Sequence, residues 1–190
     1  MLKNIVLAIA NTSDIPGILE LQELYLVSNL NEDQKKFGFV TTPFTVDLLN
    51  EVIAHEGIFI AKLNHKIIGY AFAASWAFYS QWPIFEYMIS MFSRYKFHDF
   101  DMDTISSFQY GPVCIHTDFR GQGLIKEMFE FMRIHTVKKY PIGVTFINKI
   151  NIPSTKAHVE KLKWTIIDEF SFNKNDYIVL AYDMNIPIEL

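Results

Sequence analysis

The segment best suited to chemistry is a pair of glycines that follows an arginine. The run Arg120-Gly121-Gln122-Gly123-Leu124 lies between a predicted strand and a predicted helix. Glycines let the backbone turn tightly, so several amide N–H groups and the positive end of the helix dipole face one point. The charge of Arg120 adds to this attraction. The loop is therefore suited to a diphosphate, although a purely structural strand-to-helix turn has the same glycine spacing.

The elements around this loop must hold it in place. Alternating and β-branched residues predict a strand over residues 108–117 and another over residues 142–147. Between them, residues 121–139 have helical periodicity, with Leu124, Met128 and Met132 on one face. We therefore predict a strand–helix–strand unit that carries the glycine loop at its first turn.

The remaining elements follow from turn residues and apolar spacing. Thr45 is expected to cap a helix that Gly57 ends, and Asn64-His65 is expected to form a tight hairpin turn. The other predicted elements are a strand over residues 5–10, a helix over residues 15–29, strands over residues 58–63 and 66–76, a short helix over residues 153–161 and a hairpin of residues 165–172 and 176–183.

An aromatic-rich segment interrupts this pattern. Residues 76–110 contain 12 aromatic side chains in 35 positions, against 15% in the whole chain. Ile84, Tyr87, Met88 and Met91 share helical spacing, which favours packing of at least one face. The segment is either additional core or a dimer surface, or it is the wall of a binding pocket, and the sequence leaves both interpretations open.

Composition limits the partners that the chain can have. The 190 residues include 17 Lys and Arg against 21 Asp and Glu, for a net charge of −4, and half are hydrophobic. This balance supplies no general basic field for nucleic acid or anionic lipid, and no run of about 18 apolar residues predicts a membrane helix. We expect one domain over residues 1–190 that binds neither nucleic acid nor membrane.

A single cysteine limits two other kinds of site. Cys114 stands alone, so neither an intramolecular disulfide nor a cysteine-rich zinc site can form within the chain. The histidines lack metal-ligand spacing, and we predict no metal site. The apolar run at residues 5–10 is shorter than that of a secretory signal. Together these features lead us to expect a cytoplasmic protein.

The glycine loop and its flanks resemble the GNAT superfamily of N-acetyltransferases. Members bind acetyl-CoA through a strand, then Arg/Gln-x-x-Gly-x-Gly/Ala, then a helix, and residues 111–124 are similar to that pattern. Downstream, Asn151, Ser154 and His158, followed by Lys161-Leu162-Lys163-Trp164, are similar to the family's Asn, small residue, Tyr and Lys-Leu-Gly-Phe. The predicted order of elements also resembles the order in the family.

The resemblance implies a fold and a cofactor. The expected fold is α/β (α+β), with a mixed, mostly antiparallel seven-stranded sheet splayed between strands 4 and 5, about four flanking helices and an aromatic-rich helical insertion between strands 3 and 4. The implied cofactor is acetyl-CoA, whose pantetheine arm would pair with strand backbone while loop amides hold its diphosphate. The residues implied to bind it are Val113, Cys114, Ile115, Arg120, Gly121, Gln122, Gly123, Leu124, Ile125, Lys126, Asn151 and Ser154.

The implied reaction is direct transfer of an acetyl group to a primary amine of a small molecule or peptide. His158 stands roughly where many members place the tyrosine that protonates the departing thiolate, and protonated His158 is the candidate acid. His116 is a weaker candidate for proton transfer, and Glu86, Asp99, Asp101 or Asp103 could supply a base. Cys114 lacks a nearby base in the sequence, and we interpret it as core rather than as a nucleophile.

Departures from the family pattern keep two alternatives open. Ile125 stands where the family has Gly or Ala, Lys163 stands where it has Gly, and His158 replaces the tyrosine. One alternative is a non-catalytic acyl-CoA sensor or regulatory module that keeps the cofactor cleft. The other is a scaffold homodimer that uses the aromatic segment as its surface.

Overall fold

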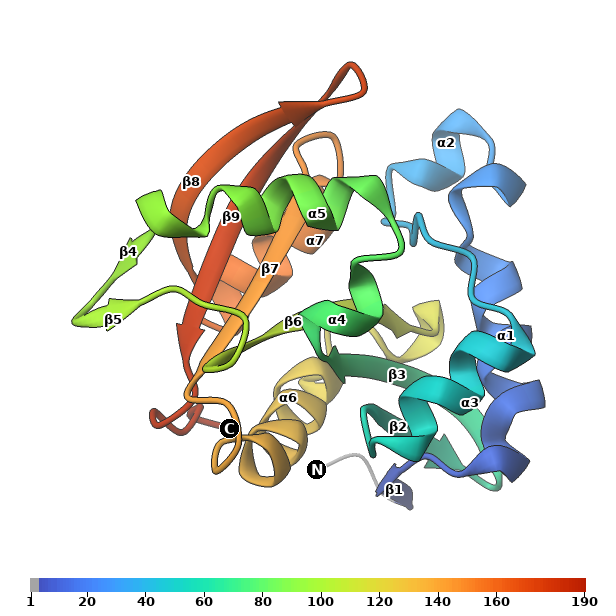
Figure 1. The fold of residues 1–190 in the computed structure, drawn as a ribbon. Helices are drawn as coiled ribbons and strands as arrows, with labels where there is room; N and C mark the ends of the chain where they lie inside the picture. The colour runs from blue at the N-terminus through green and yellow to red at the C-terminus, as the bar shows by residue number, and fades with distance from the viewer. Residues whose placement is uncertain (1–3) are drawn as a thin grey trace.

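The protein is built on one seven-stranded sheet, shown in Figure 1. The computed structural model describes residues 4–190. The strand order is β1-β2-β3-β6-β7-β9-β8, and all neighbours are antiparallel except β6 and β7, which are parallel. The strands are β1 (Ile5–Ile9), β2 (Ile58–Leu63), β3 (Lys66–Ala74), β6 (Ser107–Ile115), β7 (Ile142–Asn148), β8 (Thr165–Phe172) and β9 (Asn175–Asp183). The mixed, mostly antiparallel sheet expected from the sequence is confirmed.

Helices cover both faces of the sheet. The helices are α1 (Ile15–Tyr25), α2 (Glu32–Lys35), α3 (Val46–Ala54), α4 (Trp76–Tyr79), α5 (Pro83–Ser90), α6 (Leu124–Thr136) and α7 (Ile152–Lys156). Buried residues of α1, α3, α4 and α5 join one hydrophobic cluster, whereas those of α6 join a second cluster on the opposite face. Leu124, Met128 and Met132 are all buried, as their spacing predicts.

Local signals in the sequence account for most element boundaries. Thr45 caps α3 by accepting a hydrogen bond from the Leu48 amide. Asn64 and His65 both have positive φ, at 49° and 68°, which fits the two-residue turn expected between β2 and β3. The predicted helix 121–139 begins only at Leu124, because Gly121 and Gly123 have φ angles of 74° and 89° that no right-handed helix contains.

The helix expected to reach residue 139 ends at Thr136, and two other predicted helices change their geometry before their predicted C-terminal ends. The helix expected over residues 15–29 ends at Tyr25, where extended Leu26 leads into a 3₁₀ turn, Val27–Asn29. The short helix expected over residues 153–161 is α7 followed by a π-helical turn, Ala157–Lys161. The apolar spacing continues through both breaks, so spacing alone does not reveal them.

The aromatic segment is mainly additional core. It forms α4, α5 and a two-stranded sheet of β4 (Lys96–Phe97) and β5 (Phe100–Asp101). Figure 1 shows α5 lying across β7 and β9. Its buried aromatic side chains are Trp76, Phe78, Tyr79, Phe85, Phe92, Tyr95, Phe97, Phe108 and Tyr110. The helical insertion expected between the third and fourth strands of the sheet is confirmed.

The sheet splits between its two parallel strands. Strands β6 and β7 pair only from Ser107↔Ile142 to Gln109↔Val144. Beyond this point β6 stays with β3 as far as Ile115, while β7 stays with β9 as far as Asn148. A bulge at residues 111–112 of β6, where Gly111 has a φ of 107°, bends the strand at the point of divergence. The expected splay between the fourth and fifth strands is confirmed.

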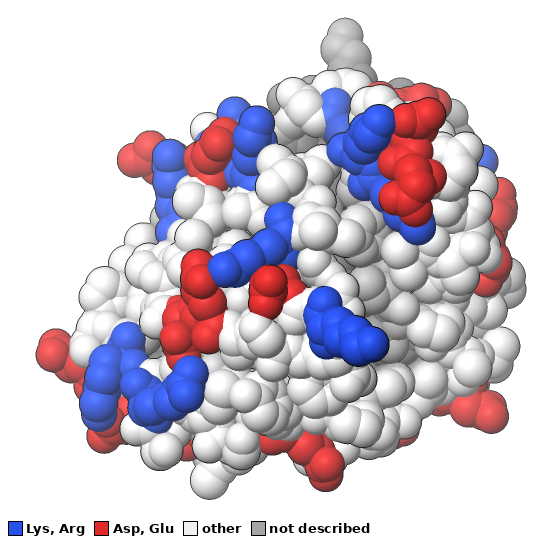
Figure 2. Space-filling view, turned by 90° about the horizontal axis from the view of Figure 1, so that it is seen from above, with Lys and Arg blue, Asp and Glu red and all other residues white. Residues whose placement is uncertain are grey.

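Charge is spread over the surface in small groups. Figure 2 shows, on one face, groups of Lys and Arg lying beside groups of Asp and Glu with uncharged surface between them. Within residues 4–190 no helix has the length and apolar character needed to cross a membrane. No group of three His, Cys, Asp or Glu side chains within the same residues converges as metal ligands do.

Candidate functional site

The glycine loop presents its backbone to open space. Gly121 and Gly123 have positive φ, and a Cβ atom built on either would meet no atom within 4 Å. The glycines are therefore required by the backbone conformation and not by close packing. Within the described chain no side chain caps the start of α6, so its first amide groups are available to an anion.

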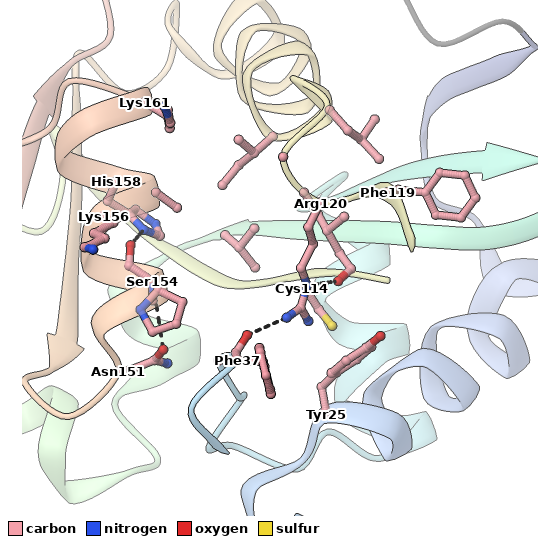
Figure 3. A pocket seen from close by; sticks show the side chains of 18 of the residues that line it. Tyr25, Phe37, Cys114, Phe119, Arg120, Asn151, Ser154, Lys156, His158 and Lys161 are labelled. Carbon is pink, nitrogen blue, oxygen red and sulfur yellow. Dashed lines mark hydrogen bonds between the residues drawn. The ribbon is translucent and has the colours of Figure 1, made fainter. Parts of the chain in front are cut away.

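Arg120 fixes this loop to its surroundings. Its Nε donates a 2.7 Å hydrogen bond to the carbonyl of Ile115, and its Nη1 donates to the carbonyl of Phe37. The guanidinium carbon also lies 4.5 Å from the centre of the Tyr25 ring. Figure 3 shows Arg120 bridging β6 and the 37–40 segment. Arg120 thus holds the walls of the cleft together as well as contributing charge.

A cavity of about 620 Å³ opens beside the loop. Its walls are the glycine loop, the C-terminal half of β6, the 37–40 segment and the helical segment from Asn151 to Lys161. The charged residues that line it are Arg120, Lys126, Lys156, Lys161 and Glu160. Four cations and one carboxylate give this cleft an excess of positive charge in a chain of net charge −4, which favours a polyanion.

Strand β6 offers backbone groups to the cavity. The amide of His116 donates to the carbonyl of Ile68 on β3. The N–H and C=O groups of successive residues point to opposite sides of a strand. The backbone groups of Cys114 therefore point to β3, as those of His116 do, whereas those of Val113 and Ile115 point to the cleft. The Ile115 carbonyl is taken by Arg120, which agrees with this direction. The backbone groups of Cys114 therefore pair within the sheet and do not face a molecule bound in the cleft, contrary to the contact expected for Cys114.

A second, smaller cavity continues from the first through the splay. It has a volume of about 110 Å³ and lies between the diverging ends of β6 and β7. The residues that line both cavities are Phe39, Val40, Val113, Asn151, Ser154 and His158. Two molecules bound in the two cavities would thus meet at the gap in the sheet.

Known structures share this architecture over the whole chain. An N-acetyltransferase from Staphylococcus aureus Mu50 has 16% sequence identity and a TM-score of 0.61, with 96% of this chain and 99% of that chain covered. An acetyltransferase of the GNAT family from Streptococcus agalactiae 2603 has 12% identity and a TM-score of 0.62, covering 95% and 96% of the two chains. The fold is that of the GNAT acetyltransferases.

A further GNAT-like structure carries its cofactor. It is a proposed acetyltransferase from Salmonella typhimurium, determined with acetyl-CoA, with 13% identity, a TM-score of 0.62 and coverage of 96% and 95%. No protein-family model matches the sequence, and no curated protein matches it significantly. At these identities the comparison establishes the GNAT fold, and the chemistry must be argued from this chain's own residues.

Asn151 and Ser154 stand at the junction of the two cavities of the GNAT fold. Asn151 is 7% exposed, its Oδ1 accepts from the Ser154 amide at 3.4 Å, and its Nδ2 donates to the Phe39 carbonyl at 3.1 Å. Asn151 therefore caps α7 and holds the 37–40 segment. Ile125 lines the larger cavity with the first turn of α6, while the side chain of Gln122 lines neither cavity and donates from Nε2 to the Asp118 carbonyl at 2.7 Å.

His158 is buried at the same junction. Its Nδ1 lies 2.8 Å from the Ser154 carbonyl, which can only accept, so Nδ1 carries the proton and neutral Nε2 is an acceptor. Burial lowers the pKa of His158 to about 4, and the hydrogen bond to Ser154 only partly opposes this effect. His158 is therefore uncharged at neutral pH, and the protonated acid expected from the sequence is not its resting state.

The buried state of His158 predicts a pH-dependent stability. The pKa is 6.5 for an ordinary histidine and about 4 here, so the unfolded chain binds the extra proton first as the pH falls. The neutral, buried state of His158 therefore contributes its full stabilisation above about pH 6.5. As the pH falls from about 6.5 to about 4, the protein loses this part of its free energy of unfolding, which amounts to about 3 kcal/mol. We expect His158→Phe to lose less stability than the wild type between these pH values, measured by urea denaturation. Equal losses in the two proteins would contradict the burial of a neutral His158.

Several other proton-transfer candidates lie outside the cleft. His116 lines neither cavity; its Nδ1 accepts from the Asp118 amide at 3.4 Å, and its ring lies against Tyr25 and Phe119. The structure therefore does not bring His116 to the reaction site. The four carboxylates considered as bases, Glu86, Asp99, Asp101 and Asp103, also line neither cavity.

Sequence reasoning missed other residues that line the cavities. Tyr25 and the 37–40 segment come from a region predicted as a helix end and a connection. Hydrogen bonds from Arg120 and Asn151 to the segment, together with backbone hydrogen bonds between Val40 and residues 25–27, hold them at the cleft. Lys156 belongs to no motif, and Lys161 is only the first residue of the Lys161–Trp164 motif, although two lysines in one helical segment are a usable signal for anion binding.

Proposed function

We propose that residues 1–190 form one acetyl-CoA-dependent N-acetyltransferase domain, which transfers an acetyl group directly to a primary amine of a small molecule or peptide. The observation that carries this proposal is the large cationic cavity, which runs from the uncapped glycine loop to the gap between β6 and β7. Acetyl-CoA has a diphosphate that suits the glycine loop and a reactive thioester that would lie at the gap between the strands.

The residues present fit acetyl-CoA. Amides from Gly121 to Ile125 would hold the diphosphate, whereas the Lys126 amide, also expected to do so, donates to the Gly123 carbonyl at 2.9 Å. Lys156 and Lys161 add positive charge on the facing helical segment. The Ile115 amide and the Val113 carbonyl face the cleft and would pair with the pantetheine arm as an added strand does, whereas the Ile115 carbonyl is taken by Arg120. When bound, acetyl-CoA supplies an activated acetyl group.

The chain's own groups support direct transfer. The Val113 amide faces the cleft at the junction of the two cavities and is placed to stabilise negative charge that develops on the acetyl oxygen. A thiol of ordinary pKa near 8.5 leaves without a strong acid, so a neutral His158 is compatible with the reaction. Burial raises the pKa of the Cys114 thiol to about 12, which argues against a covalent acyl-cysteine.

A non-catalytic acyl-CoA sensor is the second candidate. The neutral state of His158 favours it, as does the finding that no Asp or Glu among the described residues lines the smaller cavity. Such a protein would keep the cofactor cleft and lack a strong base for an alkylammonium acceptor.

Thiol release separates the two candidates. We expect acetyl-CoA to lose its acetyl group catalytically when the protein is mixed with a panel of primary amines that includes alkylamines, aromatic amines and short peptides, with the free thiol followed by a colorimetric thiol reagent. Lys156→Glu/Lys161→Glu is expected to raise the KM for acetyl-CoA by at least about tenfold, because two attractive charges become repulsive. Tight cofactor binding without thiol release from any amine would instead establish the sensor.

A further inference from the structure

We propose that the smaller cavity binds a small, flat amine of the aromatic-amine class, uncharged at neutral pH, as the acetyl acceptor. This inference rests on the proposed acetyltransferase function and specifies its acceptor. The residues that line both cavities separate the smaller cavity from the larger one, so a molecule in the smaller cavity would face the acetyl end of the cofactor.

Aromatic side chains from five elements form much of the cavity wall. They are Tyr79 of α4, Phe85 of α5, Tyr110 of β6, Phe146 of β7 and Tyr177 of β9. These rings pack on one another: Phe85 and Phe146 have centroids 5.1 Å apart, and Phe146 and Tyr177 have centroids 5.5 Å apart. Such walls favour an aromatic ring, which stacks on them or meets them edge to face.

The cavity has the size of a single small ring. Its volume is about 110 Å³, whereas an engineered cavity that binds benzene measures about 150 Å³. A one-ring amine can occupy it with its amino group at the junction. A peptide segment would have to lie largely outside.

The cavity has no countercharge for an ammonium group. Among residues 4–190, none of the side chains that line it is Asp, Glu, Lys or Arg. A protonated alkylamine would lose its hydration there and gain no ion pair, which is strongly unfavourable. Burial also raises the pKa values of Tyr79 and Tyr110 well above their usual range, because a charged phenolate is unfavourable in this environment. The same cost applies to a charged ligand.

Neutral acceptors for N–H groups line the cavity. Gln109 is 4% exposed, and its side-chain Oε1 has no hydrogen-bond partner within the part of the chain that the structure describes. Its Nε2 is already used, donating to the Tyr110 carbonyl at 2.9 Å and to Thr145 Oγ1 at 3.4 Å. A donor group of the bound molecule that reaches Gln109 would satisfy a buried acceptor that otherwise costs stability.

His158 fits a neutral acceptor as well. It lies at the junction with Nε2 as an acceptor, and its lowered pKa makes it too weak a base to deprotonate an alkylammonium of pKa about 10.4. An aromatic amine needs no such base, because its nitrogen lone pair is already free at neutral pH. Its nitrogen attacks the thioester carbonyl, the C–S bond breaks, and the amine's proton passes to solvent or to the released thiolate.

Aniline and benzylamine test this inference directly, because both have one ring and one primary amine but only benzylamine is protonated at neutral pH. We expect the kcat/KM of aniline at neutral pH to exceed that of benzylamine at least about tenfold, and the ratio to narrow toward about pH 9 as benzylamine loses its proton. A ratio near or below one at neutral pH would overturn the inference and leave the acetyltransferase function intact. Thiol release with neither amine would overturn it too, and release with other amines would then show that the failure lies in the acceptor class alone.

Two variants locate the effect in the cavity. Thr145→Val keeps the shape of the side chain and removes its hydroxyl, and we expect it to raise the KM for aniline several-fold with the affinity for acetyl-CoA unchanged. Gln109→Glu adds a carboxylate and is expected to shift the benzylamine-to-aniline ratio of kcat/KM toward benzylamine by at least about tenfold. If Gln109→Glu does not fold, Thr145→Val is the test. An unchanged KM of this variant for aniline would mean that the acceptor binds outside the smaller cavity.

Discussion

We expect Gly123→Val to lower the affinity for acetyl-CoA at least about 100-fold. Gly123 has a φ of 89°, a conformation that a β-branched residue adopts only with strain. The loop would move away from the cavity, and the diphosphate would lose charge-assisted hydrogen bonds worth about 1.5–3 kcal/mol each. Isothermal titration calorimetry measures the loss.

A matched variant separates loop geometry from general strain. Asn173 also has positive φ, at 46°, but it lies in the turn between β8 and β9 and lines neither cavity. Asn173→Val is expected to cost stability and to leave the affinity for acetyl-CoA unchanged. If Gly123→Val bound acetyl-CoA as tightly as the wild type, the loop would not be the diphosphate site.

Replacing Trp164 with Ala is expected to lower the free energy of unfolding by about 3–5 kcal/mol. Trp164 is 2% exposed and stacks on Tyr110 with ring centroids 5.0 Å apart. It also meets Phe129 of α6 at 5.8 Å and Tyr182 of β9 at 5.6 Å. The indole therefore joins both halves of the split sheet to the helix that carries the glycine loop, and urea denaturation measures its contribution.

Trp164→Phe is the control for this prediction. The Trp164 Nε1 has no hydrogen-bond partner among the described residues, so a phenyl ring removes a buried unpaired donor while keeping part of the stacking. We expect this variant to cost less than about 1.5 kcal/mol. A cost equal to that of Trp164→Ala would mean that only the full indole packs in this part of the core and that stacking of a smaller aromatic ring contributes nothing.

Local patterns in the sequence predict most of the elements and the glycine loop. Asn64-His65, Thr45 and the Gly121–Gly123 pair each act through their own backbone geometry or a cap three residues away, so neighbouring residues suffice to identify them. The splay between β6 and β7 was predicted only by resemblance. Its physical cause is the bulge at Gly111, which becomes visible when the register against β3 is known.

The properties of individual side chains in the site were harder to predict. His158 has the sequence context of an acid, but its pKa depends on burial against Tyr110 and Trp164, which come from distant parts of the chain. From the sequence, Arg120 is expected to be a free cation next to the loop, but its guanidinium donates hydrogen bonds to the carbonyls of Ile115 and Phe37. Desolvation and long-range partners are tertiary effects, and sequence spacing does not encode them locally.

Amide hydrogen exchange with and without acetyl-CoA tests the central claim most directly, because it reports both binding and position. We expect acetyl-CoA to slow exchange at residues 121–125 and at the cleft-facing amides of Val113 and Ile115, with the β8–β9 turn unchanged. Unchanged exchange at residues 121–125 in the presence of saturating acetyl-CoA would contradict the assignment of this cleft as the cofactor site.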